Sequence, residues 1–259
     1  MSAPAVFVVR DRHLLAQALA ARMVTTLVER QAAAPRARIL LAGHPFVDEV
    51  LAAVAASAAR DAVDWSQLEV WWADDAWAAA DDPMRADRRA WAALFAAVSQ
   101  GGDGPTLHPH PGTHEAPDVD EAAAQYATEL AAARDVDDHG PTPEFDVAVL
   151  VVRPDGSVAG LFPEQPAVHD QRPVCAVRGA PQPPTTRITL TVAGLASSAE
   201  VWLVAAGPEV ATAAHLMLGA AGPVQVPAAG VRGSHRTVVV LDRAAAARLP
   251  QALSRLASP

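Results

Sequence analysis

The sequence predicts an α/β fold, in which a three-layer, Rossmann-like and mostly parallel sheet has helices on both faces. Short apolar segments alternate along the chain with longer segments of helical periodicity, a pattern typical of parallel sheets. The most hydrophobic segment, residues 145–152, is nearly continuous in apolar side chains, as expected for a strand buried on both faces. The chain has 259 residues and shows no internal repeat, so we expect a single domain over residues 1–259.

The expected elements follow from local composition and spacing. In the first helix, Leu15, Leu19, Met23 and Leu27 fall on one face. The apolar runs predict strands at residues 5–9, 38–42, 68–72, 145–152, 188–192, 201–205 and 238–241. Helical spacing predicts helices at residues 14–29, 47–59, 85–98, 121–134, 209–218 and 244–257. Residues 101–118, rich in Gly, Pro and His, predict a loop.

Ligands of parallel α/β sheets bind outside the carboxyl ends of the strands. In this chain that rule points to the loops that begin at Gly43, Asp74, Arg153 and Gly207. We therefore look for functional residues there first.

Composition excludes several classes of function. The formal net charge of −9 disfavours nucleic acid as a partner, because an acidic surface repels the phosphate backbone. The sequence contains no lysine, which rules out Schiff-base chemistry and a lysine-bearing phosphate loop. Its single cysteine, Cys175, cannot form an internal disulfide and is expected to be a small core residue.

The N-terminal residues lack the charged and apolar regions of a secretion signal, and no apolar run is long enough to span a bilayer. We therefore expect a cytoplasmic protein with no membrane partner. No motif indicates a cofactor or a metal ion.

Several segments, in order along nearly the whole chain, resemble the 6-phosphogluconolactonase family, which is related to glucosamine-6-phosphate isomerases. The clearest is R-I-T-L-T at residues 187–191, directly after a proline-rich turn. Residues 153–163, R-P-D-G-S-V-A-G-L-F-P, are similar to the family's G-P-D-G-H-x-x-S-L-F-P, and residues 72–75, W-A-D-D, follow its W-G-D-E. The resemblance implies a Rossmann-like fold. It also implies hydrolysis of 6-phospho-D-glucono-1,5-lactone to 6-phosphogluconate in the pentose phosphate pathway.

The resemblance also implies a depleted active site. In the family, the histidine of P-D-G-H is the general base that activates water, and Ser157 stands at that position. A serine hydroxyl is a poor base near neutral pH, and general-base catalysis typically contributes about 10²–10⁴-fold.

The family's phosphate-binding groups are also replaced. Its glycine-rich loop here reads Ala42-Gly43-His44-Pro45-Phe46, and Pro45 has no amide donor. The arginine of G-D-E-R is Ala76 and the lysine of the G-x-x-K-A turn is Val210. The family's G-M-G before its P-D-G turn is Val151-Val152-Arg153 here, which places large side chains where glycines open the pocket. We expect lactone hydrolysis to be weak or lost.

The polar residues left on the expected ligand edge are the candidates for a site. For catalysis these are Ser157 as the family base position, Asp74 as the family aspartate, and His44 as a substitute base; for substrate binding they are Gly43, Arg153, Asp155, Gly156 and Arg187. His44 and Arg153 could form a base and an anion clamp. Alternatively, His44 is an exposed loop residue and Arg153 pairs with Asp74 or Asp155, filling the pocket.

Three other clusters have simpler interpretations. Asp74 and Asp75 are adjacent on a strand end and should point to opposite sides, so they are not expected to share a proton. His108, His110 and His114 match no metal pattern and are expected in a solvated loop. Trp72 is expected in the core, whereas Trp77 and Trp91 could line a surface.

Three functions remain open at this point. The first is a weak lactonase acting on a phosphorylated sugar lactone or related small molecule. The second is a non-catalytic paralogue that binds a protein partner, and the third is a lactonase for an unphosphorylated lactone. An open cleft with sulfate or phosphate bound at Arg187 would favour an enzyme, whereas a cleft filled by Phe46, Val151 and Arg153 would favour a protein partner. The oligomeric state is not predicted.

Overall fold

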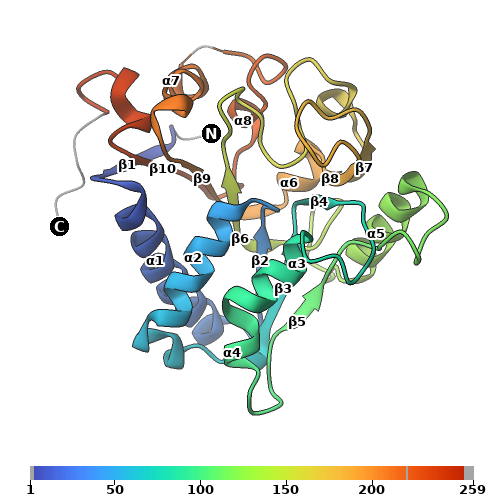
Figure 1. Ribbon diagram of the computed structural model, residues 1–259. Coiled ribbons are helices and arrows are strands. Elements are labelled where there is room, and N and C mark those ends of the chain that lie inside the picture. Colours follow the sequence, from blue (N-terminus) through green and yellow to red (C-terminus); the bar gives the residue numbers. More distant parts are fainter. Residues whose placement is uncertain (1–2, 220, 254–259) are drawn as a thin grey trace.

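Seven parallel strands form the central sheet of the computed structural model, which describes residues 3–219 and 221–253 (Figure 1). In chain order they are β1 (Ala5–Val9), β2 (Ala37–Leu41), β3 (Leu68–Trp72), β5 (Thr106–His108), β6 (Phe145–Val151), β9 (Ser198–Ala205) and β10 (Arg236–Asp242). In space they run β1-β10-β9-β6-β2-β3-β5. Strand β2 is buried at all five positions and β6 at six of seven, which agrees with burial on both faces.

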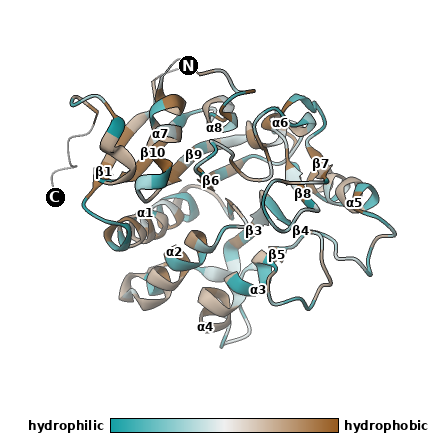
Figure 2. Ribbon diagram, turned by 45° about the horizontal axis from the view of Figure 1, so that its top comes forward, coloured by the Kyte–Doolittle hydropathy of each residue, from teal (hydrophilic) through white to brown (hydrophobic). Residues whose placement is uncertain are grey.

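Helices cover both faces of this sheet. Helices α1 (Arg12–Ala33) and α2 (Pro45–Ala56) each connect a strand to one that lies nearer the β5 edge of the sheet. The helix over 86–98, which is built from α3 (Ala86–Ala90), a π turn (Trp91–Phe95) and α4 (Ala96–Val98), does the same. Helices α5 (Val119–Ala132) and α7 (Ala211–Leu218) each connect a strand to one that lies nearer the β1 edge. Right-handed crossovers therefore place these two groups on opposite faces. Figure 2 shows α1, α2 and α4 below the sheet and α7 above it. The predicted three-layer α/β fold is confirmed.

The reversal of direction creates a crevice between the neighbouring strands β2 and β6. After β2 the chain passes through α2 to β3, toward the β5 edge of the sheet. After β6 it leads in the other direction, to β9. Such a topological switch point is where open α/β sheets bind ligands. His44 follows β2 and Arg153 follows β6, so the fold brings these two candidates to the same crevice.

A second, antiparallel sheet lies at this edge and consists of β4 (Asp74–Ala76), β8 (Arg187–Leu190) and β7 (Val174–Val177). Asp74 pairs with Thr189, which joins the first half of the chain to the second. The strand predicted at 188–192 thus belongs to this small sheet, because β8 follows β7 without an intervening helix. It ends at Leu190, and α6 (Val192–Leu195) begins directly after it.

Two other sequence predictions need correction. The predicted loop at 101–118 contains the edge strand β5, which pairs with β3. The predicted helix at 244–257 is only a 3-10 turn, Ala245–Arg248, and residues 254–257 lie outside the described residues. Among the short elements, α8 (Pro227–Gly230) completes the helices, and 3-10 turns occur at Ala58–Ala62, Trp65–Gln67, Pro166–His169 and Pro208–Val210. No helix in the described part of the chain has both the length and the apolar character to cross a membrane.

Candidate active site

The loop after β2 fixes one wall of the crevice. The Gly43 N–H donates to Asp74 Oδ1 at 3.0 Å. A Cβ at Gly43 would lie 2.4 Å from the carbonyl oxygen of Asp74, so only glycine fits at this position without displacing β4. The predicted substrate-binding residue Gly43 is therefore also needed for the close approach of two loops.

His44 caps the N-terminus of α2. Its Nδ1 accepts the backbone N–H of Phe46 at 3.1 Å. Burial, together with the nearby charge of Arg153, lowers the pKa of His44 to about 4. The neutral ring that results carries its proton on Nε2, because Nδ1 already accepts a hydrogen bond. This arrangement leaves Nε2 as a donor and argues against His44 as a general base.

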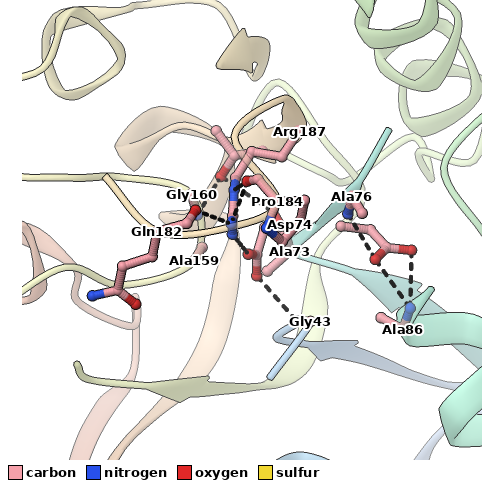
Figure 3. Close-up of polar contacts among 12 residues, drawn as sticks. Gly43, Ala73, Asp74, Ala76, Ala86, Ala159, Gly160, Gln182, Pro184 and Arg187 are labelled. Carbon is pink, nitrogen blue, oxygen red and sulfur yellow. Dashed lines mark hydrogen bonds and ion pairs between the residues drawn. The ribbon is translucent and has the colours of Figure 1, made fainter. Parts of the chain in front are cut away.

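Asp74 lies on the floor of the crevice and is fully buried. Its Oδ2 accepts Arg187 Nη1 at 3.3 Å (Figure 3). The same oxygen lies 3.6 Å from Arg153 Nη2. Burial raises the pKa of this carboxyl, but the two guanidinium groups and the Gly43 amide outweigh it, so the net shift is downward. Asp74 is therefore a carboxylate shared by two arginines. This agrees with the alternative in which Arg153 pairs with Asp74.

Asp75 points to the other side of β4. Its carboxylate accepts the N–H groups of Ala76, at 2.8 Å, and of Ala86, at 3.0 and 3.1 Å (Figure 3). Arg85 lies 3.8 Å away. Burial raises the pKa of Asp75 to about 7. The expectation that the two aspartates face opposite sides is confirmed.

Arg187 is held in place by its own loop. Its Nη2 donates to the carbonyl oxygen of Pro184 at 2.8 Å and to that of Gln182 at 3.3 Å, and its Nε donates to Pro184 at 3.2 Å (Figure 3). The guanidinium groups of Arg187 and Arg153 lie 5.4 and 5.8 Å from the ring centre of Phe162. Arg153 also donates to the carbonyl oxygen of Ala159. Both cations are thereby fixed before any ligand binds.

The turn after β6 places the remaining candidates outside the crevice. The N–H of Arg153 donates to the carbonyl oxygen of Ser157, which closes a tight turn with Gly156 at φ +81°. Asp155 is exposed and accepts the Ser157 N–H at 2.9 Å. Ser157 is fully buried, and its Oγ has no hydrogen-bond partner among the described residues. Ser157, Asp155 and Gly156 are absent from the described lining of the cleft.

Two cavities lie side by side at the crevice and share His44 and Arg153. The larger, about 520 Å³, is also lined by Gly43, Asp74, Asp75 and Arg187. We call it the cleft. The smaller, about 70 Å³, is lined by Phe46, Val151 and Val210, among others. Phe46 and Val151 thus narrow the small cavity and leave the cleft open.

Other residues of the cleft were not predicted as site residues. Trp77, Met84, Pro183 and Pro184 contribute apolar walls, and Arg89 contributes a third guanidinium group. Trp77 follows β4 directly, so a search of residues just past each strand end could have found it. Arg89 lies on a helix face, and nothing in its local sequence distinguishes it from a surface arginine.

The histidine cluster differs from the predicted solvated loop. His110 is buried, with Nε2 3.0 Å from the carbonyl oxygen of Trp72, and its ring packs edge-on against Tyr126. His108 stacks on Trp71 with ring centres 3.8 Å apart, and only His114 is exposed. The prediction failed because β5 draws this segment onto the sheet edge. Within the described residues, no group of three or more His, Cys, Asp or Glu side chains could hold a metal ion.

Comparison with known proteins identifies the family. The model of the glucosamine-6-phosphate isomerases/6-phosphogluconolactonase family matches residues 10–240. A 6-phosphogluconolactonase of Streptomyces coelicolor is 44% identical over 254 residues, covering 96% of each chain. The chain belongs to this family. A 6-phosphogluconolactonase of Mycobacterium tuberculosis is 38% identical over 245 residues, covering 93% of this chain and 96% of its own.

Solved structures share the fold of this family member. The 6-phosphogluconolactonase of Trypanosoma brucei superposes with a TM-score of 0.79 at 22% identity, covering 95% of this chain and 99% of that one. The 6-phosphogluconolactonase of Thermotoga maritima gives a TM-score of 0.76 at 21% identity, covering 92% and 99%. At these identities the likeness shows the fold alone, and function has to be argued from the site.

Proposed function

We propose that this member of the 6-phosphogluconolactonase family keeps the ligand cleft but hydrolyses 6-phospho-D-glucono-1,5-lactone slowly or not at all. Ser157 carries the proposal, because it replaces the family's catalytic histidine and its hydroxyl is buried away from the cleft. Loss of a general base removes about 10²–10⁴-fold in rate.

The small cavity supports the same proposal. The small cavity is lined by Phe46, Val151 and Val210. These residues replace, in that order, residues of the family's glycine-rich loop, its G-M-G strand end and its lysine-bearing turn. The cavity also contains the carboxylate-bearing residue Glu209, which repels an anion, and Arg12, which already forms a pair of hydrogen bonds with Glu49. Each hydrogen bond to a charged group contributes about 1.5–3 kcal/mol, so phosphate binding is expected to be weak.

The open cleft favours a small-molecule ligand over a protein partner. Its volume of about 520 Å³ lies in the usual range for ligand sites, about 300–1,000 Å³. Asp74, Arg153 and Arg187 would position a ligand, and His44 would donate a hydrogen bond from Nε2.

The buried, unpaired thiol of Cys175 is compatible with a reducing compartment, so we propose a cytoplasmic location.

An assay of the purified protein on 6-phosphogluconolactone tests the proposal. We expect acid release close to the spontaneous rate for wild type, His44→Ala and Ser157→Ala, with the Streptomyces coelicolor relative as the positive control. Turnover of wild type within the common enzymatic range, about 1–10³ s⁻¹, would contradict the proposal. If wild type did show such turnover, a lower rate of lactone hydrolysis in His44→Ala would identify His44 as the general base.

A further inference from the structure

The floor of the cleft carries an excess positive charge. Arg153 and Arg187 are both buried, and the only carboxylate that pairs with either of them within the described residues is Asp74. Two guanidinium groups and one carboxylate leave a net charge of about +1 in a region of low dielectric constant. A single negative charge on a ligand would balance it.

Donors for such an anion are also present. Arg153 Nη2 lies 3.6 Å from Asp74 Oδ2, too far for a normal hydrogen bond. Arg89 uses Nε on Asp48, at 2.8 Å, and Nη1 on the carbonyl oxygen of Met84, while its buried Nη2 has no partner among the described residues. Arg153, Arg89 and His44, whose Nε2–H is also a donor, all line the cleft.

The charge of the ligand is limited by a nearby carboxylate. Asp82 also lines the cleft, whereas the Asp75 carboxylate is turned to the Ala76 and Ala86 amides on the other side of β4. Asp82 accepts the Met84 N–H at 2.8 Å, which holds its carboxylate in place. A phosphate dianion would exceed the charge of the floor and be repelled by Asp82, whereas a carboxylate monoanion would match the floor.

Apart from Gln182, the remaining walls of the cleft are mostly apolar. Trp77, Met84, Ala78, Pro45, Pro183 and Pro184 line them. Pro45, Pro183 and Pro184 have no amide N–H, and the alanine and methionine side chains offer no strong donor. These walls suit the body of a ligand with an aromatic or aliphatic surface.

We propose that the cleft binds an organic monoanion, a carboxylate carried by an apolar ring or chain, in place of a sugar phosphate. The carboxylate contacts Arg153 and the donors around it, and the apolar body packs against Trp77 and the proline wall. This inference rests on the proposed function, in which the phosphate position is closed. It goes further by naming the class of molecule that occupies the larger cavity.

Calorimetric titration with three probes tests it: 3-phenylpropanoate, D-gluconate and glucose 6-phosphate. We expect 3-phenylpropanoate to bind at least about tenfold more tightly than either sugar probe. Trp77→Ala and Arg153→Gln should each weaken 3-phenylpropanoate binding by about tenfold or more. The matched controls are Trp91→Ala, an exposed tryptophan outside the cleft, and Arg172→Gln, an exposed arginine paired with Asp170; both should bind like wild type.

Three results would overturn the inference: tighter binding of glucose 6-phosphate, no binding of 3-phenylpropanoate at millimolar concentration, or unchanged affinity in Trp77→Ala. Circular dichroism of each variant checks folding, and Trp77→Ala keeps the test valid if buried Arg153→Gln misfolds. The lactone assay is independent of these titrations. A protein that neither hydrolyses the lactone nor binds 3-phenylpropanoate would refute the ligand class alone.

Discussion

Ser157 shows how a family position can survive as structure after its chemistry is gone. Its backbone N–H and carbonyl oxygen hold the turn after β6, while its hydroxyl is enclosed without a partner among the described residues. A buried hydroxyl without a hydrogen bond costs free energy relative to water.

We therefore predict that Ser157→Ala raises the free energy of unfolding by about 1 kcal/mol, because it removes a desolvated polar group and keeps the turn. Urea unfolding monitored by tryptophan fluorescence would measure it. The control is Thr189→Val, since Thr189 Oγ1 accepts the Gly160 N–H at 3.0 Å and its loss should destabilise by about 1–3 kcal/mol. Destabilisation by Ser157→Ala would mean that the hydroxyl has a bonding role.

At the residue scale, the sequence predicted the polar cluster better than the boundaries of the cleft. The switch-point rule, which depends only on strand order, brings Gly43, His44 and Arg153 to one crevice, and the pairing of β4 with β8 adds Asp74 and Arg187. Their functional roles remain predictions. The apolar wall and Arg89 depend on how loops and helix faces meet in space, which local patterns do not encode.

Among the elements, α5 is attached to the edge of the main sheet by Glu129, whose Oε1 lies 2.7 Å from His108 Nδ1 in β5, and by Tyr126. Tyr126 is fully buried, and its hydroxyl accepts the Trp72 N–H at 3.0 Å and donates to the Trp72 carbonyl oxygen at 3.1 Å. It thereby satisfies the backbone at the end of β3, where β5 has already ended. The same strand end leads into β4 and the cleft.

Tyr126→Phe should lower the free energy of unfolding by about 1–3 kcal/mol, because the Trp72 N–H would be left buried without its partner. Denaturant titration would measure the loss. Thr128→Ala serves as a control on the same helix, since the exposed Thr128 hydroxyl bonds only within α5, and it should change stability by less than about 0.5 kcal/mol. Equal changes in the free energy of unfolding for the two substitutions would show that the hydrogen bonds between Tyr126 and Trp72 contribute little to stability.

Long periodic elements were predicted most accurately. The first helix and the buried strands follow from regular apolar spacing, whereas β4, β5 and β7 are three or four residues long and carry no comparable signal. The C-terminal prediction at 244–257 failed because alanine favours helix without requiring it, and Pro250 interrupts the pattern.

For the whole molecule, two buried groups make stability depend on pH in opposite directions. Burial lowers the pKa of His110 from 6.5 to about 4, so its contribution is full above pH 6.5 and is lost as the pH falls through that window. Burial raises the pKa of Asp75 from 3.8 to about 7, so its contribution is full below pH 3.8 and is lost as the pH rises toward 7. His44 shifts in the same direction as His110.

We predict that His110→Phe reduces the loss of stability between pH 6.5 and pH 4, by up to about 3 kcal/mol, because the variant has no imidazole to protonate. Asp75→Asn should instead reduce the loss of stability that occurs as the pH rises from 3.8 toward 7. Thermal unfolding across pH 4–8 would compare both variants with wild type. Parallel pH profiles for wild type and His110→Phe would show that another group controls acid stability.

The pairing of β1 with β10 has a consequence for how the molecule is made. Among the described strands, β1 pairs with β10 alone, through the register from Ala5↔Val238 to Val9↔Asp242, and so is synthesised long before its partner. A nascent chain therefore carries β1 as an unpaired apolar strand until residues 236–242 have been made. The sheet cannot be completed before those residues emerge, so chaperone protection of β1 would matter most during synthesis.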